Sequence, residues 1–164
     1  MSANSQDTVI KLTAIGKIST NADALSECVA SSRLNSDESL IEVRPELEEA
    51  LTNIQLATHL IVLYWFEQAD RTVLMRTVRP GESLRRGVFA SRSPNRPNPV
   101  ALSIVRLLER DGNRLRVSGL DCLDGTLLLD LKPYVPSDDR IDDARIGWEG
   151  GCVSTCLCNE EVEQ

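Results

Sequence analysis

The segment from Arg92 to Pro99 (RSPNRPNP) limits the fold of this 164-residue chain more than any other. Its three prolines each fix the backbone angle φ and remove an N–H donor, and they restrict the preceding residues to extended conformations. We therefore expect a stiff loop between two core strands, Val88–Ala90 and Val100–Leu108, with neither a helix nor a central strand inside it. Such a loop, carrying Arg92 and Arg96, is typical of a preshaped polar surface that meets a ligand.

The rest of the chain alternates short apolar runs with turn residues, a pattern that predicts a mainly β fold. The polar stretch 19–39 predicts a long loop with a short helical stretch near 22–30. Pro45, followed by apolar residues at helical spacing, predicts a short helix over Glu46–Ile54. Asp111-Gly112 and Asp124-Gly125 predict two tight turns. Together these features indicate a small antiparallel β-barrel or sandwich with one or two short helices. The further expected strands are Ile10–Ala14, Leu40–Val43, His59–Phe66, Thr72–Val78, Leu115–Leu120 and Leu127–Leu131.

Length and cysteine usage restrict the class of protein. A chain of this length is expected to form one domain. No apolar run approaches the roughly 20 residues of a membrane helix, and the first residues lack the pattern of a signal peptide, so we expect a cytoplasmic protein without a membrane segment. The five cysteines, three of them in a C-x3-C-x-C pattern near the C-terminus, indicate reduced thiols and no metal site.

The charge is distributed unevenly along the chain. The formal net charge is −7, which argues against a general nucleic-acid binder, yet the segment Arg71–Arg116 holds eleven basic and three acidic residues. One interpretation is an electrostatic footprint for phosphates. The other is that these arginines form ion pairs on the outside of a sheet, and charge alone favours this second interpretation.

The chain lacks the short motifs of common nucleotide-binding and hydrolase folds. It has no G-x-G-x-x-G, P-loop or G-x-S-x-G motif, and its single histidine, His59, heads a buried strand, so no catalytic residue is indicated. The arginines of the proline-rich loop can bind carboxylate or phosphate. Asp124-Gly125 is either a plain hairpin turn or an acceptor that lets a ligand come close. These residues alone predict a β-barrel that binds an anionic or polar ligand near 92–99.

Three blocks of sequence, Gly87–Ser103, Leu120–Thr126 and Leu129–Pro136, resemble the TsaA-like (YaeB, TrmO) family in order and spacing. The resemblance covers residues 9–140 and leaves 141–164 as a C-terminal tail. It implies a small β-barrel that is unrelated to Rossmann-type methyltransferases. The implied activity is S-adenosyl-L-methionine-dependent N6-methylation of threonylcarbamoyladenosine at position 37 of tRNA, in the anticodon loop. The implied partners are tRNA and a second copy of the chain in a homodimer.

The resemblance also implies which residues bind the cofactor and the RNA. The acidic turn would accept from the ammonium or ribose hydroxyls of S-adenosylmethionine, Arg92 would hold a carboxylate or phosphate, and Leu102 would cover the adenine. Arg96, Lys132 and Tyr134 are expected to contact RNA or orient the target base. The expected cofactor-binding residues are Glu67, Gln68, Arg92, Leu102, Asp124, Gly125, Thr126 and Leu127, with Glu67 and Leu127 chosen from their neighbourhood alone.

Several positions depart from the family pattern. The region Ser26–Leu34 lacks the Pro-Arg-Gln stretch, Glu67 stands where the family has histidine, and Leu127 and Val100-Ala101 replace Pro and Ile-Gly. The first two departures affect the cofactor site, and all of them leave room for a different methyl acceptor. Two alternatives therefore stay open: a methyltransferase acting on another RNA or a small molecule, and a non-catalytic S-adenosylmethionine-binding module.

Overall fold

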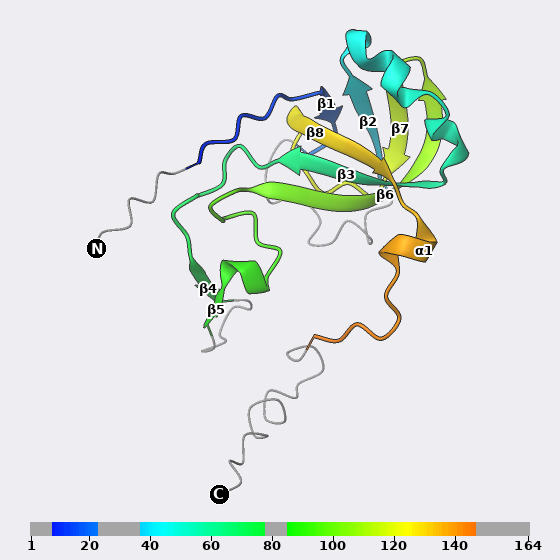
Figure 1. Ribbon diagram of the computed structural model, residues 1–164. Helices are drawn as coiled ribbons and strands as arrows, with labels where there is room; N and C mark the ends of the chain where they lie inside the picture. The colour runs from blue at the N-terminus through cyan, green and yellow to red at the C-terminus, as the bar shows by residue number, and fades with distance from the viewer. Residues whose placement is uncertain (1–7, 23–36, 78–84, 147–164) are drawn as a thin grey trace, which may run out of the picture. The chain divides into compact units, whose positions relative to one another are not determined.

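The computed structural model describes residues 8–22, 37–77 and 85–146, and six antiparallel strands within them close into a barrel. Neighbouring strands follow the order β1-β2-β7-β6-β3-β8, and β8 pairs with β1 to complete the ring (Figure 1). The expectation of a small antiparallel β-barrel is confirmed. The barrel strands are β1 (Gly16–Ser19), β2 (Glu38–Val43), β3 (His59–Trp65), β6 (Val100–Asp111), β7 (Arg114–Ser118) and β8 (Thr126–Pro133).

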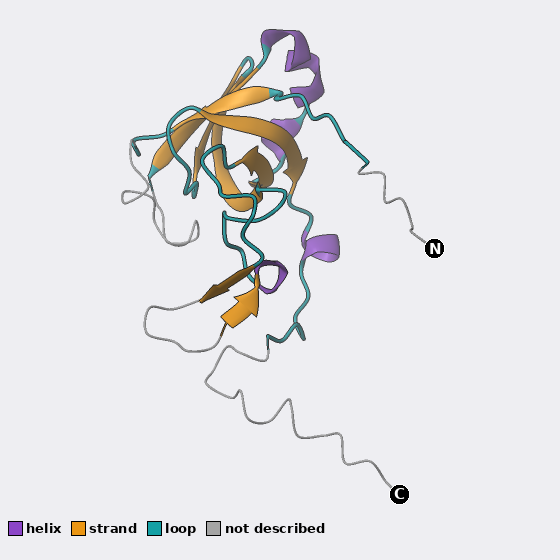
Figure 2. Ribbon diagram, turned by 90° about the vertical axis from the view of Figure 1, so that its left-hand side faces the viewer, coloured by secondary structure: helices purple, strands orange, loops and turns teal. Residues whose placement is uncertain are grey.

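A two-stranded ribbon and four short helical turns complete the described chain (Figure 2). Strands β4 and β5 pair with each other in a sheet separate from the barrel. The first compact unit of the chain ends at Tyr134, and a second begins at Val135 and contains α1. The remaining elements are η2 (Pro45–Leu51), η3 (Ile54–Leu56), β4 (Met75–Thr77), β5 (Arg85–Gly87), η4 (Val88–Ala90) and α1 (Pro136–Asp139).

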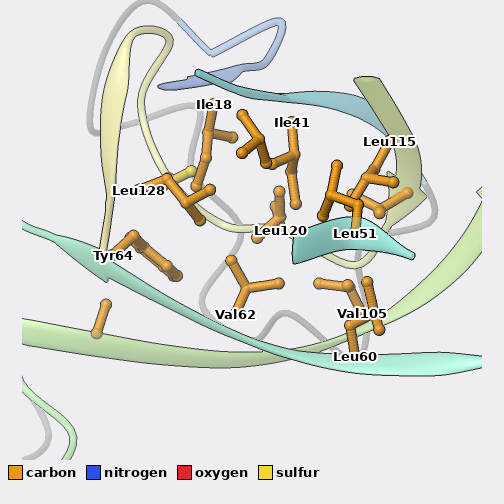
Figure 3. Packing of buried hydrophobic residues seen from close by; sticks show 14 residues of the cluster. Ile18, Ile41, Leu51, Leu60, Val62, Tyr64, Val105, Leu115, Leu120 and Leu128 are labelled. Atoms are coloured by element: carbon orange, nitrogen blue, oxygen red, sulfur yellow. The ribbon is translucent and has the colours of Figure 1, made fainter. Parts of the chain in front are cut away.

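Alternation along the strands builds the core. On β3, Leu60, Val62 and Tyr64 are buried, while the residues between them are half-buried. Their side chains point into the same space as Ile18 and Leu128 from β1 and β8 (Figure 3). Because the side-chain period of a strand is two, every second residue is left on the outer wall of the barrel, where it is available for a surface site.

Glycines stand at the points where the backbone needs them. Gly112 and Gly125 have φ values of +56° and +79°, which side-chain-bearing residues rarely adopt, and the two expected turns are confirmed at these positions. At Gly16 glycine is required by the close approach of the neighbouring backbone and not by the angle φ. A Cβ atom there would come within 2.3 Å of the carbonyl oxygen of Glu42, so only glycine allows β1 to lie this close to β2.

The strand expected over Ile10–Ala14 is wrong, because β1 begins only at Gly16. Ile10 and Leu12 are 78% and 61% exposed. Their alternation with polar residues is that of a half-buried strand, but the place between β2 and β8 is taken by β1. The alternation of Ile10–Ala14 therefore did not produce a strand, because no described strand is left to pair with this segment.

The run Val88–Ala90 is not a core strand either. It forms the 3-10 turn η4, in which Ser91 N donates to Val88 O, and Phe89 is 81% exposed. Val88 N donates to Leu74 O, so this bond continues the β4–β5 pairing up to the start of the turn. The proline-rich segment that follows is a loop as expected, and it leads directly into β6.

Three other expected elements differ in detail. The helix over Glu46–Ile54 is found in place but as two 3-10 turns, since Asn53 adopts a left-handed φ of 68° between them. The strand Thr72–Val78 is the shorter β4. The helical stretch near 22–30 lies outside the described residues except for its first position. None of the helices in the described ranges has the length and apolar character needed to span a membrane.

Candidate functional site

The proline-rich loop is joined to the chain that follows β3. Residues 66–72 and 95–99 share three hydrogen bonds, so two segments far apart in the sequence form one surface. Two of the bonds use backbone carbonyls of the prolines themselves. The three bonds run from Phe66 N to Pro99 O (3.0 Å), from Asp70 N to Asn95 Oδ1 (3.0 Å) and from Arg71 Nε to Pro97 O (2.9 Å).

Trp65, the last residue of β3, lies on the outer wall beside this joint. Its cross-strand partners are Val100 on β6 and Leu127 on β8. The guanidinium carbon of Arg71 lies 5.7 Å from the centre of the indole ring, within the range of a cation–π contact. Arg71 thus covers Trp65 while it also binds the proline-rich loop. Trp65 and Leu127 are both half-buried and together form an apolar surface at this end of the barrel.

The acidic turn before β8 is bound to the end of β1. Asp124 Oδ1 accepts from Thr20 N at 3.1 Å, and Gly125 N donates to Ile18 O at 2.9 Å. Lys17 lies over the glycine, since a Cβ at Gly125 would be 3.0 Å from Lys17 Cε. The exposed carboxylate of Asp124 and the ammonium of Lys17 therefore stand close to a stretch of backbone without a side chain.

A polar cluster inside the barrel connects the sequence blocks behind these loops. The hydroxyl of Tyr64 donates to Asp121 Oδ1 at 2.6 Å, and Ser103 Oγ donates to the same oxygen at 3.0 Å. Burial raises the pKa of Tyr64 far above its ordinary value, and the hydrogen bond to Asp121 raises it further. Tyr64 is on β3, Ser103 on β6 and Asp121 on the β7–β8 connection, so this cluster fixes all three segments relative to one another.

The two arginines of the proline-rich loop differ in their surroundings. Arg92 is exposed, and its side chain makes no hydrogen bond or ion pair within the described residues. Arg96 is half-buried and donates from Nη2 to the carbonyls of Val88 and Ser91. Its Nε is buried without a partner in the described part of the chain. Arg96 therefore braces the loop from within, whereas Arg92 is available to a ligand.

The structure brings most of the sequence-predicted residues to one end of β3. Glu67 and Gln68 follow Phe66 after the end of β3 and are exposed, and Leu102 is 48% exposed on the outer wall of β6. Thr126 is buried and donates to Leu123 O, so it holds the turn and offers little surface.

Two predicted residues lie elsewhere. Lys132 is the cross-strand partner of Ile61, and Tyr134 N donates to His59 O at the beginning of β3. Since a strand rises about 3.3 Å per residue, this end of β3 is roughly 20 Å from Trp65. Lys132 also forms an ion pair with Asp130. Lys132 and Tyr134 are therefore separate from the group around Trp65.

The arginines of the basic segment fall into two sets. On β7, Arg114 is paired with Glu42, and Arg116 with Glu38 and Glu109, as the second interpretation of the charge pattern predicted. Arg76, Arg85 and Arg92 form no ion pair with a carboxylate of the described residues. The ion-pair interpretation is therefore confirmed for the arginines of β7, and the phosphate-binding interpretation stays a prediction for the others. In residues 8–22, 37–77 and 85–146, no group of three or more His, Cys, Asp or Glu is arranged to hold a metal ion.

Sequence reasoning missed several residues of this region. Trp65 was assigned only to a buried strand, although its odd position among His59–Trp65 places it on the outer wall. Lys17 and Arg71 belong to no sequence motif. The strand register reveals Lys17, and the loop contacts reveal Arg71. Tyr64 and Ser103 occupy inward positions of their strands, and this periodicity was the one signal that could have paired them.

Comparison with known proteins places this arrangement in a family. Residues 20–140 match the family model described as the tRNA-methyltransferase O N-terminal domain. The chain belongs to this family. Membership confirms the family resemblance of the three sequence blocks, and the match covers every barrel strand except β1.

Relatives and solved structures agree with the assignment. A probable S-adenosyl-L-methionine-binding protein of Archaeoglobus fulgidus is 44% identical over 140 residues, which are 85% of this chain and 38% of that protein. The tRNA (adenine(37)-N6)-methyltransferase of Escherichia coli is 39% identical over 107 residues, 61% of this chain and 46% of that enzyme. A crystal structure of TrmO superposes with a TM-score of 0.74 at 34% identity, covering 85% of this chain and 64% of that one. The chain thus spans less than half the length of these two relatives.

Proposed function

We propose that this protein is an S-adenosyl-L-methionine-dependent methyltransferase that methylates N6 of threonylcarbamoyladenosine at position 37 of tRNA. The observation that carries the proposal is the convergence of family-matched segments at the Trp65 end of β3. The loop after β3, the proline-rich loop and the start of β8 meet there. Family membership and the relatives named above support the same activity.

The residues at this end of the barrel fit the chemistry of S-adenosylmethionine. Its adenine needs an apolar surface, which Trp65, Leu102 and Leu127 offer on the outer wall. Its ammonium and ribose hydroxyls need acceptors, and the carboxylate of Asp124 is exposed at the turn before β8. Its carboxylate needs a cation, and Arg92 is exposed and makes no ion pair with a described carboxylate.

The chain's own part in the reaction is to bind and to align. The cofactor supplies an activated methyl group on a sulfonium, which is already a good leaving group. The protein therefore has to hold the methyl carbon and the acceptor nitrogen in line, and rigid positioning alone can supply a large part of the rate. The hydrogen bonds between residues 66–72 and the proline-rich loop hold the loop that carries Arg92 before a ligand arrives. This lowers the entropy lost on binding.

We assign the residues to roles accordingly. Arg96, Lys132 and Tyr134 are proposed for the RNA, with Arg96 acting through the loop that it braces and the other two contacting RNA away from the cofactor. We add Trp65 and Lys17 to the cofactor site on the grounds given above. The residues proposed to bind the cofactor remain Glu67, Gln68, Arg92, Leu102, Asp124, Gly125, Thr126 and Leu127.

The activity is tested by methyl transfer from labelled S-adenosylmethionine. Purified protein is incubated with tRNA that carries threonylcarbamoyladenosine and, in parallel, with the same tRNA lacking that modification. We expect label at position 37 of the first tRNA alone. An absence of label under conditions where the Escherichia coli relative is active would contradict the proposal for this acceptor.

One observation favours a second candidate, a methyltransferase on a different acceptor. Glu67 is exposed directly at the site where the family has histidine, and it brings negative charge to a surface that would meet RNA. Label transferred to another RNA or to a small molecule, but not to the modified tRNA, would establish this alternative. Cofactor binding without any transfer would instead identify a non-catalytic binding module.

We further propose a homodimer in the cytoplasm, with a barrel domain over 9–140 and a tail over 141–164. The exposed apolar side chains of Val9, Ile10 and Leu12 support a dimer, since a second copy could cover them. Analytical ultracentrifugation tests this directly. We expect a dimer for the wild type and a shift toward monomer for the Leu12→Ser variant, and a monomeric wild type would contradict the proposal.

A further inference from the structure

Arg71, in the loop after β3, is held by two contacts on the wall around Trp65. Its Nε donates to Pro97 O at 2.9 Å, and its guanidinium carbon lies 5.7 Å from the centre of the indole ring. The hydrogen bond and the stacking contact both restrict the planar guanidinium, so little further freedom is lost when it binds a ligand. Arg71 is nevertheless exposed, and the rest of its side chain stays accessible.

The Nη groups of Arg71 have no acceptor within the described residues. Neither Nη atom donates to a described oxygen, and no described carboxylate forms an ion pair with this arginine. The carboxylate of the neighbouring Asp70 is engaged elsewhere, because its Oδ1 accepts from the backbone N and the hydroxyl of Thr72. A guanidinium that is fixed in orientation and keeps free N–H donors can bind a planar anion through paired hydrogen bonds.

The two arginines of the proline-rich loop leave this property of Arg71 unused. Arg96 donates to carbonyls of its own surroundings, and Arg92 is proposed to hold the carboxylate of the cofactor. S-adenosylmethionine has one carboxylate, and its ammonium and sulfonium are cationic. Arg71 therefore adds a guanidinium to the Trp65 end of β3 for which the cofactor offers no second anion.

The proposed acceptor carries a carboxylate of its own. In threonylcarbamoyladenosine the nitrogen N6 bears the threonylcarbamoyl group, and the carboxylate of that group is only a few bonds from N6. A residue that binds this carboxylate must therefore lie beside the cofactor, whichever way the RNA approaches. Arg71 meets this requirement, because it covers Trp65 and is bonded to the loop that carries Arg92. Proteins that recognise RNA by sequence usually read such functional groups on unpaired loop bases.

We propose that Arg71 binds the carboxylate of the threonylcarbamoyl group and thereby distinguishes the modified adenosine from unmodified adenosine. This assignment rests on the proposed function, because it takes that nucleoside as the acceptor. It adds a specificity-determining residue that belongs to no sequence motif. Trp65 and Pro97 O fix the guanidinium, and its Nη edge then offers parallel hydrogen bonds to the two carboxylate oxygens.

The test compares two synthetic anticodon stem-loop RNAs by fluorescence anisotropy, with S-adenosylhomocysteine present so that no methyl transfer occurs. One RNA carries threonylcarbamoyladenosine at position 37, and the other carries its carboxamide, which removes the charge and keeps the shape. We expect the wild type to bind the carboxylate RNA about tenfold more tightly, through one charge-assisted contact at an exposed site. Arg71→Gln should bind the two RNAs with equal affinity.

Arg110→Gln is the matched control. Arg110 also donates from Nε to a backbone carbonyl, that of Gly112, but it lies near the end of β6. This variant should keep the tenfold preference of the wild type. Arg71→Lys keeps the charge without the planar pair of donors, so it should restore only part of the preference. A variant that merely loosens the proline-rich loop would weaken both RNAs alike, and the ratio of their affinities would not change.

A wild type without any preference, or a preference that survives in Arg71→Gln, would overturn the proposal. Equal weakening of both RNAs in Arg71→Gln, with a slope of log Kd against log salt that falls by about 0.7, would identify an RNA phosphate as the ligand and overturn it as well.

Methyl transfer is measured separately, which keeps this test independent of the proposed function. A wild type that prefers the carboxylate RNA through Arg71 but transfers no methyl group would disprove the activity and leave the carboxylate contact standing. A wild type that methylates tRNA, with Arg71→Gln equally selective, would disprove the contact and leave the activity standing.

Discussion

Tyr64 and Asp121, 57 positions apart in the sequence, are joined by a hydrogen bond of 2.6 Å inside the barrel. Ser103 donates to the same carboxylate oxygen, so the bond has a second donor beside it. The three residues connect β3, β6 and the β7–β8 connection, which leads into the acidic turn of the proposed cofactor site. The stability of the barrel and the shape of the site are therefore linked through one carboxylate.

Replacing Tyr64 by phenylalanine removes one donor to that carboxylate. Because hydrogen bonds to charged groups contribute about 1.5–3 kcal/mol, we expect the free energy of unfolding to fall by about 2 kcal/mol. Urea unfolding monitored by circular dichroism measures it. Ser103→Ala removes the longer of the two hydroxyl hydrogen bonds that this carboxylate accepts, so it should cost less, and a larger loss in Ser103→Ala would contradict the ranking.

The same pair predicts a pH dependence. Burial raises the pKa of Tyr64 above its ordinary value of 10.0, so the folded chain holds the phenolic proton more tightly than the unfolded chain does. The resulting stability is complete below about pH 10 and is lost as the pH rises above it, by up to about 1.4 kcal/mol per pH unit. The wild type should therefore lose stability more steeply than Tyr64→Phe between about pH 10 and 11.5. Parallel curves for the two proteins would contradict this.

Gly125→Ala should affect both folding and ligand binding. Its φ of +79° costs an alanine about 1–2 kcal/mol, and the new Cβ would meet Lys17. Gly112→Ala is the matched control, since Gly112 also has a positive φ but lies in the β6–β7 turn. Thermal melts should show both variants destabilised, whereas calorimetry should show weaker S-adenosylmethionine binding for Gly125→Ala alone.

Gly16→Ala should interfere with closure of the barrel. A Cβ at this position would lie 2.3 Å from a backbone oxygen of β2, and backbone cannot move aside as a flexible side chain can. We expect a loss of more than about 3 kcal/mol, or accumulation of insoluble protein. A soluble Gly16→Ala protein with the melting temperature of the wild type would show that β1 does not require this close contact.

Arg92→Ala should weaken cofactor binding about tenfold, because one charge-assisted contact at an exposed site would be lost. Arg106→Ala serves as the control, since Arg106 is likewise exposed but lies on β6 opposite His59, at the far end of β3. Isothermal titration with S-adenosylmethionine distinguishes them. Equal affinities for the two variants would remove Arg92 from the site.

The sequence predicted the barrel well where local signals and tertiary pairing agree. The strands around Val62 and Leu128, and the turns at Gly112 and Gly125, follow from period-two alternation and from glycine in a turn. The two strands that were wrongly expected have one cause. Ile10–Ala14 has the alternation of a strand and Val88–Ala90 has the apolar character, but a strand requires a partner, and pairing depends on residues distant in the sequence.

The candidate site was likewise predictable from the sequence only in part. The family motif drew attention to Arg92, Asp124 and Gly125. The structure finds Asp124 and Gly125 just before Leu127, the cross-strand partner of Trp65, and Arg92 in the loop whose residues 95–99 are bonded to the chain after β3. The different surroundings of Arg92 and Arg96 were not visible in the sequence, because the carbonyls that Arg96 binds belong to a turn that was expected to be a strand. Lys17 became part of the site only through the register of β1 against β8.

The division of the arginines also governs how a partner would approach. Outside Arg71–Arg116 the chain has 7 basic and 22 acidic residues, and the β7 arginines are already paired with glutamates. The net charge of −7 repels a polyanion, so its attraction to this protein depends on arginines that carboxylates do not neutralise, such as Arg92 among the described residues.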